Sequence, residues 1–250
     1  MKIETFPLAQ ALAIGCFLVM GVSSLAFSEV ASEPGFIAVS TVGENQAAAG
    51  LKEALATSVV DAVHLTGRPN GYFGDAAIKI LLPQPLQPIE TGLRAVGYGP
   101  KIDQFVLSMN RAAEAAAPKA EPIFKRAIEN MTFGDAQRIV SGGGHSATDY
   151  FKAKTSGELT VAFTPVVKET MAEYSVTKQY DDLLNHYQTG PMGFGGLLGG
   201  VTQNFDLNSY VVRKSLDGLF YVVGQEEEKI RTNPAAQITP LLRQVFGKGF

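Results

Sequence analysis

Three consecutive glutamates, Glu226–Glu228, stand near the end of a long predicted helix and could act as acids, bases or ligands. Neighbouring helix positions point about 100° apart, so the three carboxylates cannot all face one ligand. Glu227 follows Val223 by four positions and precedes Ile230 by three, which places it on the apolar face of that helix. Arg231 lies four positions after Glu227, in the order that favours an ion pair.

A second polar set, Asn110, Arg111 and Glu114, lies in an otherwise alanine-rich helical stretch. Alanine-rich faces let helices approach closely, so polar groups on them become partly buried and need partners. We expect Arg111 or Glu114 to meet Glu227 or Arg231 across two helices. Two interpretations of these five residues stay open: a structural network, or a pocket that binds a ligand.

The glycine-rich stretch Ser141–Ser146 (SGGGHS) comes just before a predicted helix start. Exposed N–H groups at Gly143 and Gly144, together with the helix dipole, could hold a phosphate or carboxylate, and His145 could donate to it. An anion-binding loop of Gly143, Gly144, His145 and Ser146 is therefore one hypothesis. The alternative is a glycine connection in which Ser146 simply caps the helix.

Asp182 and His186 lie four positions apart on a predicted helix and share a face, so they could supply two metal ligands. No further histidine is spaced to join them, and we predict an exposed Asp–His pair and no metal site. The sequence also lacks G-x-S-x-G, H-E-x-x-H and G-x-x-x-x-G-K-[ST]. These absences favour a protein without a cofactor or catalytic activity.

The first 28 residues predict export. No charged residue occurs from Phe6 to Ser28, Leu12–Val22 has the length of a signal-peptide apolar core, and Ala26–Ser28 offers small residues for cleavage. We therefore predict a signal peptide over residues 1–28 and a periplasmic or envelope location. Two alternatives stay open: lipidation at Cys16 within a loose lipobox, and a retained anchor that associates with the membrane through the N-terminus.

Composition indicates a folded domain without a nucleic-acid partner. With 46% hydrophobic residues, a chain of 250 residues can bury an adequate core. The formal net charge of −3 offers no basic face for nucleic acid. Cys16 is the only cysteine, which excludes a disulfide framework.

Apolar residues recur every three to four positions along most of the chain from residue 45 onward, as in amphipathic helices. We expect a flexible tether over residues 29–44 and an all-α fold over 45–250. That fold is a single multi-helical domain of about eight to ten helices after the N-terminal signal segment. The expected helices include 46–65, 85–96, 102–116, a long pattern from Ser146 to Met171, 208–231 and a last one around 238–245.

Local signals refine this outline. Thr132 with Asp135, and Ser146 with Asp149, have the spacing of capping boxes. Breaks are expected at Gly157 and Pro165. Ile78–Leu82 is a short apolar run that predicts either a strand or a buried extended segment. The glycine-rich stretch Gly190–Gly200 predicts a mobile loop whose apolar side chains could act as a lid or dock on a partner.

Several stretches, in order and spacing, resemble domain-of-unknown-function family 4197, a family of exported helical proteins. The resemblance covers roughly residues 45–247 and implies a helical exported domain, but it implies no activity. The chain departs from the family at Gly144-His145, where acidic residues are expected, so a role for an acidic pair there does not carry over. The stretches that carry the resemblance are Gly50–Leu55, Met109–Glu114, the glycines after Val140, Ala147–Phe151, Leu216–Phe220 and Glu226–Pro234.

These observations lead to one main functional hypothesis and two alternatives. We expect an exported envelope protein that binds a small or amphiphilic ligand, or an envelope partner, without catalysis. A hydrolase that uses carboxylates such as Glu114 and Glu227 is the first alternative. A purely structural interaction protein is the second.

Overall fold

The computed structural model describes residues 35–189 and 205–232, and the regular structure in these ranges is entirely helical. The predicted all-α class is therefore confirmed. The elements are α1 (Gly35–Gly67), a 3₁₀ turn (Gln84–Leu86), α2 (Gln87–Ala95), α3 (Gly99–Ala116), a second 3₁₀ turn (Ala117–Lys119), α4 (Ala120–Glu129), α5 (Phe133–Ser141), α6 (Ser146–Glu173), α7 (Val176–Thr189) and α8 (Leu207–Thr232).

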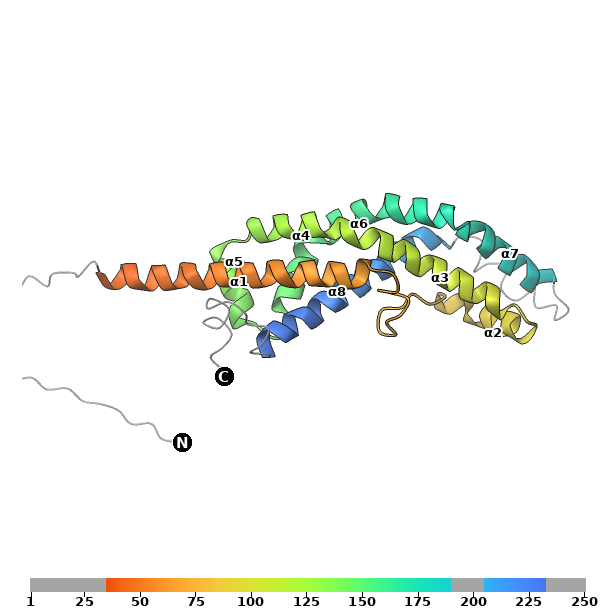
Figure 1. The fold of residues 1–250 in the computed structure, drawn as a ribbon, viewed down its shortest axis with the longest axis horizontal. Helices are drawn as coiled ribbons and strands as arrows, with labels where there is room; N and C mark the ends of the chain where they lie inside the picture. The colour runs from red at the N-terminus through yellow and green to blue at the C-terminus, as the bar shows by residue number, and fades with distance from the viewer. Residues whose placement is uncertain (1–34, 190–204, 233–250) are drawn as a thin grey trace, which may run out of the picture.

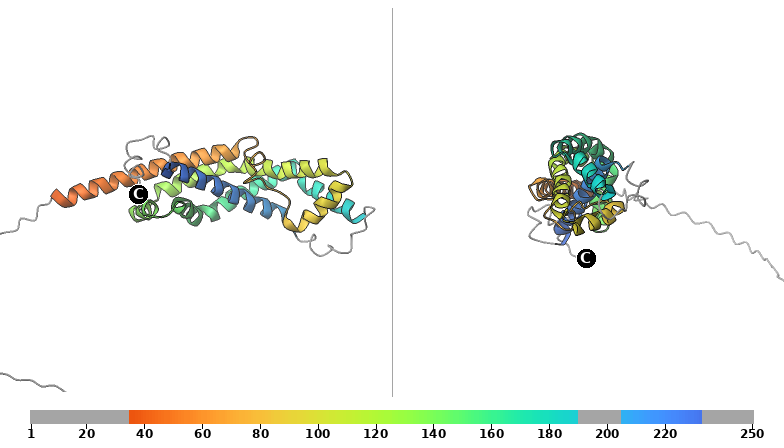
Figure 2. Two further views of the ribbon diagram at one scale, coloured as in Figure 1. Left: turned by 90° about the horizontal axis from the view of Figure 1, so that it is seen from below. Right: turned by 90° about the vertical axis from the view of Figure 1, so that its right-hand side faces the viewer.

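The helices form an elongated bundle (Figure 1). α8 packs most extensively against α6 and α1, and it also contacts α3. α2 and α7 lie together at one end of the bundle, and the first turns of α1 project beyond the other end (Figures 1 and 2). Among the helices of the described ranges, none combines the length and hydropathy that crossing a bilayer requires.

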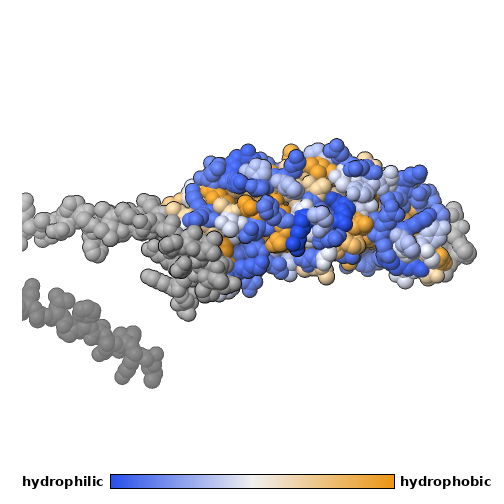
Figure 3. Space-filling view, in the orientation of Figure 1, coloured by the Kyte–Doolittle hydropathy of each residue, from blue (hydrophilic) through white to orange (hydrophobic). Residues whose placement is uncertain are grey.

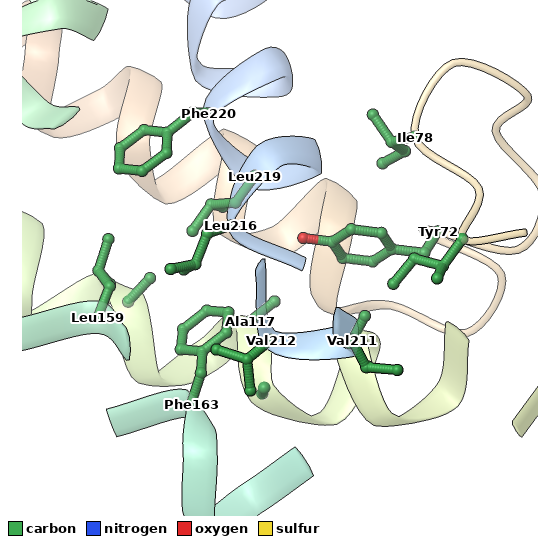
Figure 4. Close-up of a cluster of buried hydrophobic side chains, with 14 of the residues drawn as sticks. Tyr72, Ile78, Ala117, Leu159, Phe163, Val211, Val212, Leu216, Leu219 and Phe220 are labelled. Atoms are coloured by element: carbon green, nitrogen blue, oxygen red, sulfur yellow. The ribbon is translucent and has the colours of Figure 1, made fainter. Parts of the chain in front are cut away.

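The core runs along the bundle between α6 and α8. Side chains of Leu159 and Phe163 on α6 meet Val212, Leu216 and Phe220 on α8 (Figure 4). Each of these five side chains is less than a tenth exposed. Burying one side chain of this size contributes about 1.5–3 kcal/mol, so this seam is a main source of the stability of the fold.

Two helices are longer than expected. α1 begins at Gly35, eleven positions before the predicted start at residue 46. The predicted breaks at Gly157 and Pro165 are wrong, because α6 continues through both. Pro165 has no N–H to donate to the carbonyl of Val161, four positions earlier in α6. Both residues lie on the exposed side of the helix, where water can bond to that carbonyl.

The expected range of eight to ten helices is centred too high for the described residues, because no break divides the long α6. Its buried side chains recur at about every fourth position and hold it against α8 and α3. Those side chains are Phe151, Thr155, Leu159, Phe163, Val167 and Met171.

The segment between α1 and α2 contains the one stretch for which a strand was considered. Ile78, Ile80 and Leu82 are buried, whereas Lys79 is half-buried and Leu81 is 56% exposed. This alternation is that of an extended segment, and the segment belongs to no strand in the described residues. Of the two alternatives, the buried extended segment is therefore the one found.

Five sequence predictions concern residues outside the described ranges. They are the signal peptide, lipidation at Cys16, the retained N-terminal anchor, the glycine-rich loop 190–200 and the last helix around 238–245.

Candidate functional site

Asn110 on α3 holds the extended segment by its backbone. Its Oδ1 accepts a hydrogen bond from Ile80 N at 2.8 Å, and its Nδ2 donates to Ile80 O at 2.8 Å and to Val106 O at 2.7 Å. The side-chain amide thus pairs with Ile80 as a neighbouring strand would. Asn110 is fully buried, and all its bonds are internal.

Glu114, one turn further along α3, holds the loop that follows α1. Its Oε1 accepts hydrogen bonds from the N–H groups of Tyr72 and Phe73, both at 3.1 Å. Its Oε2 pairs with Arg111 at 2.5 Å, and Arg111 also donates to Asn70 Oδ1 at 2.9 Å. Glu114 is 4% exposed, so its charge is balanced by one cation and two backbone donors.

Tyr72 connects this loop to α8. Its hydroxyl donates to Ser215 O at 2.6 Å, and its ring lies close to Gly218, beside Ile78 (Figure 4). A Cβ at Gly218 would lie 2.6 Å from Tyr72 Cε1, so the ring and the helix backbone touch. Burial and the nearby Glu114 carboxylate raise the pKa of the Tyr72 hydroxyl, which keeps it protonated as a donor.

Glu227 points into the protein, as the spacing in its helix predicts, and is 3% exposed. Its oxygens accept hydrogen bonds from Ala147 N at 2.9 Å, Thr148 N at 2.8 Å and Thr148 Oγ1 at 2.8 Å. These donors belong to the first turn of α6, where N–H groups lack partners within the helix. A carboxylate from α8 therefore caps α6 and meets the positive end of its dipole.

Arg231 completes this arrangement. Its guanidinium donates to Glu227 Oε1 from Nε at 3.0 Å and from Nη2 at 2.8 Å, and Nη2 also donates to Ile139 O at 2.9 Å. The ion pair therefore joins α8 to the last residues of α5 as well as to α6. α8 lies close to the start of α6 at Gly224, where a Cβ would be 3.4 Å from His145 Nδ1 and 3.5 Å from Thr148 Oγ1.

The expected contact between the two polar sets is wrong. Glu114 and Arg111 bond with the loop after α1, whereas Glu227 and Arg231 bond with the ends of α5 and α6. The two sets lie at different levels of the bundle, because α8 reaches Tyr72 through Ser215 and Gly218, more than two turns before Glu227. The structure therefore separates them into two polar clusters.

The hypothesised anion-binding loop lies where expected, directly before α6, but its helix start already holds an anion of the protein itself. The N–H groups that hold the Glu227 carboxylate belong to Ala147 and Thr148 rather than to Gly143 and Gly144. The predicted capping box of Ser146 and Asp149 is wrong. His145 is the N-cap residue, and the Ser146 hydroxyl donates to Gly143 O at 2.7 Å.

Asp182 and His186 share the exposed face of α7, as their spacing predicts. They bond through the backbone, since His186 Nδ1 lies 2.6 Å from the carbonyl oxygen of Asp182. Within the described residues, no group of three or more histidine, cysteine, aspartate or glutamate side chains has a metal-binding arrangement.

The structure also shows a groove that was not predicted from the sequence. It runs between α6 and α8 and has a volume of about 620 Å³. Val212, Leu216 and Phe220 contribute buried apolar surface from α8. The α6 side is polar and carries Lys152, Ser156, Thr160, Thr164 and Lys168 at every fourth position.

The two lysines at the ends of this row are exposed and form no ion pair in the described parts of the chain. The Lys152 ammonium lies 6.0 Å from the centre of the Phe220 ring. Lys168 lies near Asp206, whose pKa is lowered by hydrogen bonds from Ser209 and further by this lysine. The i, i+4 spacing on α6 was the available signal, but only the packing of α8 makes it one wall of a groove.

The described residues define an all-helical bundle. The carboxylates of Glu114 and Glu227 are bonded within the protein, and a groove with a polar and an apolar side lies between α6 and α8. The chain belongs to the family of proteins of unknown function DUF4197, whose model matches residues 41–247. This confirms the resemblance found in the sequence. Comparisons with curated proteins and with solved structures found no match.

Proposed function

We propose that this protein is an exported, non-catalytic binding protein of the cell envelope that holds an amphiphilic ligand in the groove between α6 and α8. The groove itself is the observation that supports this proposal. Its volume of about 620 Å³ lies within the range of small-molecule sites. An apolar floor beside a polar wall suits a ligand that has both an apolar chain and a polar head.

The length of the groove favours a chain-like ligand. Lys152 and Lys168 are sixteen positions apart on α6, which corresponds to about 24 Å along the helix. Lys152, Lys168 and Arg213 line the groove, against Asp206 and Asp217. The excess of cations favours an anionic head group.

The distribution of hydrophobic residues on the surface favours binding in a groove over binding through a broad apolar interface. On the face drawn in Figure 3, hydrophobic residues come to the surface in separate patches among hydrophilic ones. A broad apolar face would favour the alternative of a purely structural interaction protein. Export is proposed from the N-terminal sequence alone.

The alternative of a carboxylate-dependent hydrolase has less support in this geometry. Glu114 and Glu227 are nearly fully buried, and their oxygens accept bonds from backbone N–H groups and arginines of the same chain. A general acid or base must reach the proton that it transfers. The bonds of both carboxylates instead join elements of the fold.

The first experiment is native mass spectrometry of the protein purified gently from its own envelope fraction. A bound mass of a few hundred daltons is expected. In a second step, the emptied protein is titrated with dodecyl phosphate and with dodecyltrimethylammonium, which share a chain and differ in head-group charge. We expect the phosphate to bind more tightly than the ammonium.

Charge reversal locates the site. The double variant Lys152→Glu, Lys168→Glu should lose dodecyl phosphate binding by about tenfold or more, corresponding to at least 1.4 kcal/mol. Lys154→Glu is the matched control, because Lys154 is exposed on the same helix and does not line the groove. A bare mass with no binding of either amphiphile would overturn the proposal and direct the search to protein partners.

A further inference from the structure

A second cavity lies where α7 packs against the start of α3, away from the groove. It has a volume of about 160 Å³, which is about the room of five water molecules. Its lining is polar apart from Leu183 and the ring of Tyr98. The lining residues are Tyr98, Lys101, Gln104, Gln179, Asp182, Leu183 and His186.

Gln179 has an unused acceptor at this cavity. Its Nε2 donates to Tyr174 O at 2.6 Å, while its Oε1 is buried and has no hydrogen-bond partner. If Nε2 and Oε1 of Gln179 were exchanged, the amide oxygen would face the carbonyl oxygen of Tyr174, so the assignment of the amide nitrogen and oxygen holds. A buried acceptor without a partner is costly, and a donor that reached it from the adjoining cavity would remove that cost.

His186 offers a second polar atom. A carbonyl oxygen can only accept, so the Nδ1 that lies 2.6 Å from Asp182 O carries a proton. In the neutral ring this tautomer leaves Nε2 as an acceptor. The ring is held in place by Tyr98, whose centroid lies 4.7 Å away.

Two opposite charges line the same cavity. The Lys101 ammonium lies 5.2 Å from the centre of the Tyr98 ring, and Asp182 contributes a carboxylate. Neither residue forms an ion pair in the described parts of the chain. A lone ammonium in the cavity would be repelled by Lys101, and a lone carboxylate would be repelled by Asp182 and by the acceptors.

We infer that this cavity binds a small zwitterion, with its ammonium on the Gln179, His186 and Asp182 side and its anionic group on Lys101. This inference is independent of the amphiphile groove. Two sources offer such a ligand: a free amino acid, and the head group of a zwitterionic phospholipid. The shared chemistry is an ammonium close to an anionic oxygen group.

The test is an NMR titration of isotope-labelled protein with four probes. L-alanine and phosphoethanolamine carry both charges, whereas propionate and ethylamine each carry one. We expect both zwitterions to shift the Gln179 side-chain amide signal and to bind about tenfold or more tighter than the single-charge probes. Tighter binding of phosphoethanolamine than of alanine would identify the lipid head group as the source, and the reverse would identify a free amino acid.

Variants check the location. Gln179→Met and Lys101→Met should each weaken zwitterion binding at least several-fold, and Lys178→Met is the matched control on α7. Lys101 is exposed, so that variant keeps the test valid if Gln179→Met does not fold. Equal response to all four probes, or no response at Gln179, would overturn the inference and leave the cavity as a water site.

Discussion

The carboxylate of Glu227, on α8, accepts hydrogen bonds from both the backbone N–H and the hydroxyl of Thr148, 79 positions earlier at the start of α6. A helix start is usually capped by a residue next to it in sequence. Here the cap comes from another helix and carries a full charge, which Arg231 balances. The contact therefore caps α6 and also holds α6 against α8 at one buried point.

Glu227→Gln tests this cap. The substitution keeps the shape but removes the charge that faces the Arg231 guanidinium and the α6 dipole. We expect a loss of about 3 kcal/mol in the free energy of unfolding, or roughly 6–12 °C in Tm for a domain of this size. The measurement is thermal unfolding followed by circular dichroism.

Glu228→Gln is the matched control, because Glu228 is the exposed neighbour on the same helix. Its effect should stay within about 0.5 kcal/mol. An unchanged melting curve for Glu227→Gln would contradict the structural role and return Glu227 to the list of candidate site residues.

Asn110→Ala should release the extended segment from α3. The change removes both hydrogen bonds to Ile80 and leaves the buried N–H and C=O of Ile80 without partners. The expected loss in the free energy of unfolding is about 2–3 kcal/mol. Hydrogen exchange at the Ile80 amide should speed up more than exchange in the α6 core. Asn130→Ala, at an exposed helix end, serves as the control; equal exchange at Ile80 in both variants would argue against the role of Asn110.

A pair of glycine substitutions tests the contact between Tyr72 and α8. Gly218→Ala places a Cβ 2.6 Å from the Tyr72 ring and 3.1 Å from Ile78 Cβ, and the ring cannot move freely because its hydroxyl is bonded to Ser215. We expect a loss of about 1–3 kcal/mol from overpacking, measured by denaturant unfolding.

Gly157→Ala should have the opposite sign. Gly157 lies inside α6, and a Cβ added there would meet no atom within 4 Å, so alanine should stabilise the helix by about 0.5–1 kcal/mol. A Gly218→Ala variant that is as stable as the unchanged protein, or more stable, would contradict the close approach of Tyr72 to α8.

We predict that the contribution of the Asp135 carboxylate to the stability of the protein is lost in acid. Hydrogen bonds from the Thr132 hydroxyl and backbone N–H, with Arg138, lower the pKa of this carboxyl from 3.8 to about 2. Because the folded-state pKa lies below the ordinary value, the stabilisation is fully present above about pH 4 and is lost as the pH falls toward 2. The difference in unfolding free energy between the protein and Asp135→Asn should therefore narrow across that range. Parallel pH curves for the two proteins would refute the capping geometry.

Periodicity and local signals were enough to predict much of the fold. The apolar spacing predicted the main helices, and the capping box of Thr132 and Asp135 is present as expected. Asp206, just before α8, accepts from Ser209 N at 3.0 Å. These features depend on residues within one or two turns of each other, which a single sequence displays directly.

Predictions failed where distant residues decide the structure. Pro165 does not break α6, because buried contacts with α8 and α3 hold the helix on both sides of it. Ser146 does not cap α6, because Glu227 takes the free N–H groups. In both cases a local preference of about 1–3 kcal/mol is outweighed by tertiary contacts.

The sequence by itself determined that Glu227 faces the core and that Asn110, Arg111 and Glu114 need partners, because these conclusions follow from helix periodicity and from the cost of burying polar groups. Only the tertiary structure decided which partners they have: Thr148 and Arg231 for Glu227, Ile80 for Asn110, and Tyr72 for Glu114. The physical reason is that hydrogen bonds between elements depend on how helices are placed in space, and periodicity along the chain carries no record of that placement. The same holds for the groove, whose two walls become one site only when α8 packs against α6.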